Sequence, residues 1–292
     1  MDILILLESN HHILIMIVGV FSLLIGSFLN AVIYRIPLML KRAWKRDCQT
    51  ILEKTSSHID DGQMFNLLLP SSHCPHCGHS ITALENIPIL SYLLLKGRCS
   101  ACHKKISIEY PIIEIVTTLL SMLLAWQFGY SLELAASLVL LWTLIVLFMI
   151  DAKTLLLPDN LTYPLLWLGI IINFNTVFID LESSVIGAIA GYLSLWSVYH
   201  IFRLITGKEG MGYGDFKLLA ALGAWGGWQI LPFVIMSAAT FGAIAGTIWI
   251  YLSHRDPNTQ PIPFGPYLAV AGFIAIVWRE DVMQLMWLYF PV

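Results

Sequence analysis

The sequence of 292 residues has little charge: Asp, Glu, Lys and Arg make up only 12% of it, about half the share in soluble domains. Hydrophobic residues make up 58%, and the mean hydropathy is +0.76. A soluble chain could not bury this much apolar surface, so the composition predicts a membrane protein in a lipid bilayer. The net charge of −3 gives no sign of nucleic-acid binding.

No Lys or Arg precedes the first apolar run. The charged residues before it are the acidic Asp2 and Glu8. A cleavable secretory signal needs a positive start, so we expect a retained helix. The sequence lacks internal repeats, and it lacks a G-x-G-x-x-G segment that would indicate a Rossmann-type cofactor site. Nothing in it indicates an oligomeric state.

Long apolar runs are abundant, and a membrane-spanning helix needs about 17–25 such residues. We predict an all-α polytopic membrane protein with about eight transmembrane helices, of which the sixth and eighth are short. The runs are Ile13–Ile33, Ile112–Phe128, Leu134–Ile150, Leu161–Ile179, Val185–Ile205, Phe216–Trp228, Ile230–Leu252 and Phe264–Trp278.

The segment 35–110 differs from the apolar runs, since it is polar and holds ten of the 16 Lys and Arg residues. We therefore expect a first helix at 1–34, a small cytoplasmic domain at 35–110 and a seven-helix membrane domain at 111–292. Positive charge marks cytoplasmic loops, and with this domain inside only Arg279 faces out. Both termini are then extracytoplasmic.

Four of the five cysteines form two C-x-x-C pairs separated by 21 residues: Cys74, Cys77, Cys99 and Cys102. Such pairs typically close a tetrahedron of thiolates around Zn²⁺, so the segment is predicted to be zinc-ribbon-like. Four thiolates leave no open coordination position, and the metal should be structural. The alternative is a redox or simply reduced set of cysteines, and the neighbouring histidines could replace a ligand.

Two aspartates stand where predicted helices meet the same face of the membrane. Asp151 ends the third apolar run, and Asp215 opens the sixth, 64 residues later. Two carboxyls about 3 Å apart in a poorly solvated site share one proton, as in aspartic proteases, so one can activate water while the other donates. The simpler interpretation is a helix cap or an interfacial charge for each.

Gly212 and Gly214 surround this second aspartate in the sequence G-M-G-Y-G-D-F-K at 210–217. Glycine permits unusual backbone angles and a close approach of another chain. An extended substrate could therefore pair with the backbone here, and we assign both glycines to substrate positioning. The alternative is a plain flexible loop before a helix.

The 210–225 segment resembles the G-x-G-D signature of bacterial type IV prepilin peptidases. Further stretches agree in order with this family, at 26–37, 86–99, 151–159 and 263–267. The resemblance implies cleavage of prepilin and pseudopilin leaders at the cytoplasmic face of the inner membrane, with Asp151 and Asp215 as the catalytic pair. It also assigns the metal site to the four cysteines.

The resemblance further implies a second activity. Members with the cysteine-bearing domain also methylate the new N-terminal residue with S-adenosylmethionine, so we expect a bifunctional protease and N-methyltransferase. The residues that bind S-adenosylmethionine are not identifiable from the sequence, and the stretch 41–69 matches no known motif. The rival functions are a proton-coupled transporter, which would place carboxylates near mid-membrane, and a catalytically silent scaffold.

Overall fold

The computed structural model describes residues 7–51, 65–208, 210–253 and 262–289. Asp2, which precedes the first apolar run, and Lys54 and Arg255, two of the 16 Lys and Arg residues, lie outside the described residues. The chain divides into two compact units, residues 1–130 and 131–292. In the described residues every regular element is helical, apart from two isolated β-bridges in the cysteine-bearing segment. The predicted all-α class is confirmed.

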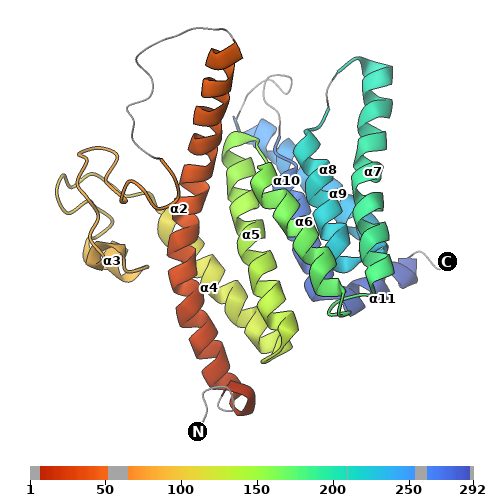
Figure 1. Ribbon diagram of the computed structural model, residues 1–292, viewed down its shortest axis with the longest axis horizontal. Coiled ribbons are helices and arrows are strands. Elements are labelled where there is room, and N and C mark those ends of the chain that lie inside the picture. The colour runs from red at the N-terminus through yellow and green to blue at the C-terminus, as the bar shows by residue number, and fades with distance from the viewer. Residues whose placement is uncertain (1–6, 52–64, 209, 254–261, 290–292) are drawn as a thin grey trace. The chain divides into compact units, whose positions relative to one another are not determined.

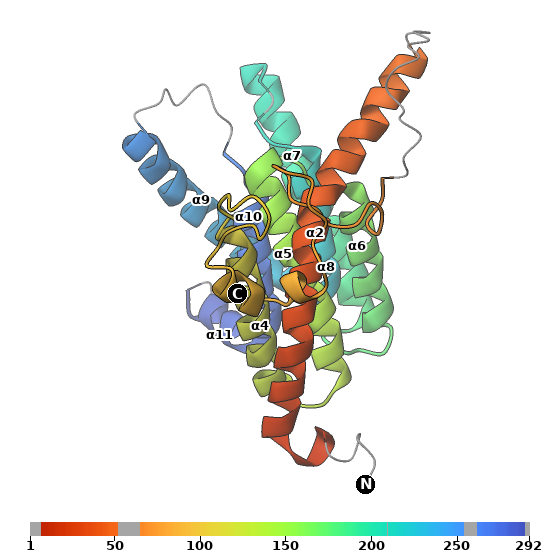
Figure 2. The same cartoon turned by 90° about the vertical axis from the view of Figure 1, so that its left-hand side faces the viewer.

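Unit 1 is built on two long helices, α2 (His11–Ile51) and α4 (Glu109–Phe128), which run side by side (Figure 1, Figure 2). They approach closely at Gly26, where an added Cβ would lie 2.9 Å from Cα of Glu114. Along the chain, the short helices η1 (Leu84–Asn86) and α3 (Leu90–Leu94) and the cysteine-bearing loops come after α2 and before α4. The polar segment starts as a continuation of α2, which is 41 residues long.

Unit 2 holds the remaining helices, shown from green to blue in Figure 1. They are α5 (Leu132–Thr154), α6 (Asp159–Asn173), α7 (Leu181–Thr206), α8 (Tyr213–Gly226), η2 (Trp228–Ile230), α9 (Leu231–Ser253), α10 (Gly265–Val277) and α11 (Arg279–Tyr289).

Helix α8 is the centre of unit 2, because it packs against α6, α7 and α10 and is apolar on nearly all sides. A helix that is apolar all round is a buried helix. Its 14 residues rise only about 21 Å, less than the ~30 Å hydrocarbon core of a bilayer. The neighbouring α10 packs against α5, α8 and α9.

The eight predicted apolar runs correspond to α2 and α4–α10, and five helices of the described chain are long and apolar enough to cross a membrane. The fourth run differs from its helix, since α6 ends at Asn173 and not at Ile179. The buried Asn173 side chain accepts hydrogen bonds from the backbone N–H groups of Phe178 and Ile179. These bonds hold the chain in a turn where apolar composition alone predicts more helix.

Candidate active site and metal centre

Asp151 lies in the last turn of α5 and is only 5% exposed. Its Oδ2 accepts a hydrogen bond of 3.0 Å from the backbone N–H of Gly265, at the start of α10. Leu155 ends the helix in the left-handed conformation, and its N–H donates to the carbonyl oxygen of Asp151. The carboxyl therefore stays at the end of the helix, pointing toward α10.

Asp215 lies in the first turn of α8 and is 7% exposed. The next residue, Phe216, is fully buried, and its ring lies 5.6 Å from that of Tyr199 on α7. This packing anchors the first turn of α8. Gly212 is the N-cap residue of α8, and its carbonyl oxygen accepts a hydrogen bond from the backbone N–H of Asp215.

The two glycines before Asp215 have different surroundings. A Cβ at Gly214 would lie 2.6 Å from Cβ of Leu157, so no larger residue fits without moving the chain. A Cβ at Gly212 would meet only ordinary contacts, with Oδ2 of Asp215 at 3.7 Å. Neither glycine has a positive φ, so the structure uses close approach rather than unusual backbone angles.

Leu157 brings the two aspartate segments together. Its side chain contacts Gly214, next to Asp215, and also Gly265, whose N–H binds Asp151. Two buried carboxyls from different helices therefore lie at the same end of unit 2.

Sequence reasoning missed Gly265 and Leu157 as parts of this site. Both lie in stretches that carry the family resemblance, at 263–267 and 151–159, and this resemblance is the sequence feature that could have indicated them. Nothing in the local pattern around Gly265 points to a residue 114 positions earlier.

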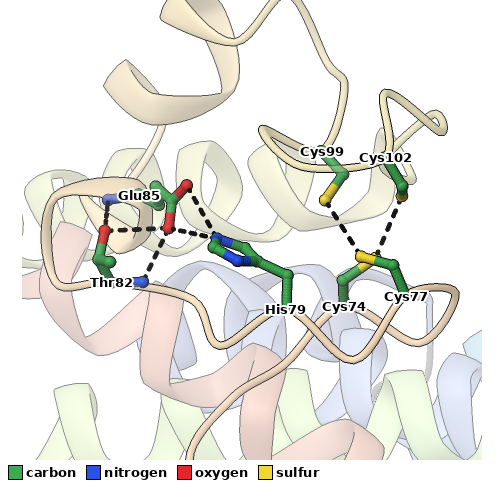
Figure 3. Close-up of polar contacts among 7 residues, drawn as sticks. All are labelled: Cys74, Cys77, His79, Thr82, Glu85, Cys99 and Cys102. Carbon is green, nitrogen blue, oxygen red and sulfur yellow. Dashed lines mark hydrogen bonds and ion pairs between the residues drawn. The ribbon is translucent and has the colours of Figure 1, made fainter.

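The four cysteine thiols of the C-x-x-C pairs converge, with all sulfur atoms within 4.8 Å of one another. Sγ of Cys74 is 3.8 Å from that of Cys102, and Sγ of Cys77 is 4.0 Å from that of Cys99 (Figure 3). Zn–S bonds of about 2.3 Å place tetrahedral sulfurs about 3.8 Å apart, so the arrangement fits one zinc ion. The fifth cysteine, Cys48, is exposed on α2.

Backbone amides prepare this cluster for a cation. The N–H groups of His76 and Cys77 point at Cys74 and lower the pKa of its thiol to about 6. Those of Cys102 and Ala101 likewise lower the pKa of Cys99. At Cys77 the N–H of His79 also lowers the pKa, but burial and the neighbouring thiols outweigh it and raise the value to about 11. A bound cation would relieve this crowding of sulfur charge.

Glu85 connects the two cysteine loops beside the cluster (Figure 3). Its carboxylate contacts the hydroxyl of Ser100, between the second pair of cysteines, and accepts from the N–H and the hydroxyl of Thr82. It also lies 3.3 Å from Nε2 of His79. In the described residues only the four cysteines form a candidate metal cluster, and His79 faces Glu85.

Three buried polar residues organise the rest of unit 1. Arg35 donates hydrogen bonds to the carbonyl oxygens of residues 66, 67 and 70. The carboxylate of Glu114 accepts from the N–H of Ile89, a β-branched residue at φ 59°. Asn30 donates to the carbonyl oxygen of Tyr110. These contacts give Glu114 and Asn30 visible structural roles.

Comparison with known proteins identifies the family. Residues 20–128 match the bacterial Peptidase A24 N-terminal domain, and residues 138–247 match the Type IV leader peptidase family. The chain belongs to the type IV leader peptidase family. The two matched regions fall in unit 1 and unit 2 respectively.

Several relatives of this leader peptidase carry the name prepilin leader peptidase/N-methyltransferase. The protein of Stutzerimonas stutzeri is 51% identical over 276 residues, which is 94% of each chain. That of Pseudomonas putida is 49% identical over 91% of this chain and 93% of its own. That of Dichelobacter nodosus is 51% identical over 95% and 96%. No solved structure matches this chain.

Proposed function

We propose that this leader peptidase cleaves the leaders of type IV prepilins and pseudopilins, with Asp151 and Asp215 as its catalytic carboxyls. The observation that carries this proposal is the pair of buried carboxyls from α5 and α8 at one end of unit 2. The relatives' printed name and the family match support the reaction and the substrate class.

The geometry suits general acid–base hydrolysis. One carboxylate of the pair takes a proton from water, and the resulting nucleophile attacks the scissile carbonyl carbon while the protonated partner donates to the carbonyl oxygen. Collapse of the tetrahedral intermediate breaks the C–N bond, and the leaving amine takes up a proton. Gly212, whose Cβ position has room around it, and Gly214 are proposed to pair with an extended substrate backbone beside Asp215.

Single substitutions test the pair. Asp151→Asn and Asp215→Asn each keep the side-chain shape but remove the acid–base function, so each should abolish cleavage of a co-expressed prepilin, read by mass spectrometry. Glu133→Gln, in the first turn of the same helix α5, is the matched control and should cleave normally. Full cleavage by either aspartate variant with the wild-type unfolding midpoint would overturn the assignment, and it would leave the scaffold function open.

We also infer that the enzyme transfers a methyl group from S-adenosylmethionine to the new N-terminal amine, as the relatives' name indicates. When bound, S-adenosylmethionine would supply the methyl group from its sulfonium to the deprotonated N-terminal nitrogen. The residues that bind this cofactor are unassigned. The same mass spectra test the proposal, since the cut product should gain the mass of one methylene.

The proposed metal is one structural Zn²⁺ held by Cys74, Cys77, Cys99 and Cys102. The tetrahedral spacing of the thiols supports it, and four protein ligands leave no position for chemistry. Purified protein should contain about one zinc per chain by elemental mass spectrometry. Cys99→Ser should lose most of it, whereas Cys48→Ser should keep it. A metal-free preparation with full activity would remove the zinc proposal.

For the topology, we propose a multi-pass inner-membrane protein with residues 35–110 in the cytoplasm and both termini outside. The first helix, this cytoplasmic domain and the membrane domain at 111–292 are the proposed functional parts. The distribution of Lys and Arg supports this orientation. Thiol labelling tests it: Cys48 should react with a membrane-impermeant reagent only after the membrane is opened.

A further inference from the structure

Lys217 and Asp159 form an ion pair between the start of α8 and the start of α6. Nζ of Lys217 lies 2.6 Å from Oδ1 of Asp159 and 5.1 Å from the centre of the Tyr163 ring. The lysine side chain is 18% exposed and the aspartate 56% exposed.

The pair joins two segments that also meet at Leu157 and Gly214. The segment that follows Asp151 places Leu157 against Gly214, and two residues later it places Asp159 against Lys217. Gly214 and Lys217 stand on either side of Asp215 in the sequence. The chain that leaves the first aspartate therefore holds the second aspartate from both sides.

The energetics separate a positioning role from a stabilising one. An ion pair with an exposed partner contributes little to folding, because water screens it and two long side chains lose freedom. Catalysis responds far more steeply to geometry, since a displacement of about 1 Å at a reacting group can cost about 100-fold in rate. Small losses of stability can therefore accompany large losses of turnover.

We propose that the Asp159–Lys217 ion pair positions the two proposed catalytic carboxyls, by fixing the start of α8 against the segment that leads from Asp151 into α6. The pair acts through Asp215 and does not itself exchange protons with the substrate. This inference rests on the proposed function of the two aspartates.

Steady-state cleavage of a purified prepilin by the full-length enzyme tests the inference. Asp159→Asn and Lys217→Met should each lower kcat about 10- to 100-fold with KM changed by less than about twofold. Lys217→Arg, which keeps the charge, should retain most of the activity. Lys208→Met removes an exposed lysine just after α7 and should behave as wild type.

A charge exchange guards against variants that only misfold. The double variant Asp159→Lys with Lys217→Asp restores an ion pair. Its kcat should therefore exceed that of Asp159→Lys alone and of Lys217→Asp alone, at similar unfolding midpoints. Multiplicative losses in the double variant would overturn the proposal, as would single variants with more than half the wild-type kcat. A raised KM with unchanged kcat would also overturn it, because Asp159 would then be binding the substrate.

The failure of this inference is distinguishable from that of the proposed function. If Asp151→Asn is inactive while Lys217→Met is fully active, only the positioning role is wrong. If Asp151→Asn is fully active, the dyad itself is wrong. Methylation of a pilin peptide that already has a free N-terminus should continue in Lys217→Met, which separates lost positioning from a lost fold.

Discussion

Gly187 of α7 and Gly223 of α8 face each other so closely that a Cβ on either would lie 2.2 Å from the carbonyl oxygen of the other. Such a contact is possible only without side chains, and it is a common way for membrane helices to pack. One turn further along α7, Gly191 lies against the carbonyl of Leu219 in the same manner. These contacts set the distance between α7 and the helix that carries Asp215.

Replacing Gly187 by Ala should therefore destabilise unit 2 severely. The new methyl group would press on backbone, which cannot turn aside as a side chain can, and overpacking of this kind costs at least about 1–3 kcal/mol. The midpoint of thermal unfolding in detergent should fall clearly. Gly242→Ala is the matched control and should be nearly neutral, because the nearest atoms to its Cβ would belong to the Tyr267 side chain, at 3.3 Å or more, and not to backbone. Equal midpoints for the two variants would contradict the packing argument.

Gly265→Ala should reduce cleavage while leaving the fold intact. Its Cβ would lie 2.7 Å from Oδ2 of Asp151 and 3.1 Å from Cδ1 of Leu157, so the carboxyl must turn away. On the proposed mechanism, kcat should drop at least about 10-fold. Prepilin cleavage and the unfolding midpoint, measured on the same preparation, check this. Unchanged kcat would show that the orientation set by the Gly265 N–H is not needed.

The sequence predicts those features that local composition determines. Apolar runs indicate the long helices because lipid requires helical hydrogen bonding, and the paired cysteines converge because their spacing suits one metal. Contacts between distant segments leave no such local pattern. The hydrogen bond from Gly265 to Asp151 and the ion pair between Lys217 and Asp159 depend on how helices pack, so they became visible only in the structure.

Acid should weaken the cysteine-bearing segment partly through Glu85. The hydroxyl of Ser100 and the N–H of Thr82 favour its charged form and lower its pKa from 4.5 to about 2. A lowered pKa in the folded state stabilises the protein above pH 4.5, and this contribution is lost as the pH falls from about 4.5 to 2. Glu85→Gln removes the contribution at every pH.

Zinc release to a chelator measures this effect. At pH 7 the Glu85→Gln protein should release zinc faster than the wild type, because it lacks the stabilising contribution of the charged carboxylate. Glu109→Gln, which changes a carboxylate in the first turn of α4, is the control and should follow the wild-type curve. Equal rates for Glu85→Gln and the wild type at pH 7 would exclude Glu85 as a source of this stabilisation.

Asn173 is the fully buried residue that ties the end of α6 to α8. Its Nδ2 donates to the carbonyl oxygens of Ala224 and Trp225, and its Oδ1 accepts from two backbone N–H groups. Each buried polar group left without a partner costs about 1–3 kcal/mol. Asn173→Ala leaves several buried backbone groups without a hydrogen-bond partner, so the free energy of unfolding should fall by at least about 3 kcal/mol.

The comparison of two further variants shows whether the amide's hydrogen bonds, rather than its volume, cause this loss. Asn173→Asp keeps the acceptor but sets a carboxylate against the carbonyl oxygens of Ala224 and Trp225, so it should be as damaging as Asn173→Ala although it is isosteric. Asn160→Ala, at the exposed start of the same helix, should change little. A stable, active Asn173→Asp enzyme at pH 7 would mean that the donor half of the side chain is dispensable. The turn at 174–179 would then owe its form to the acceptor half alone.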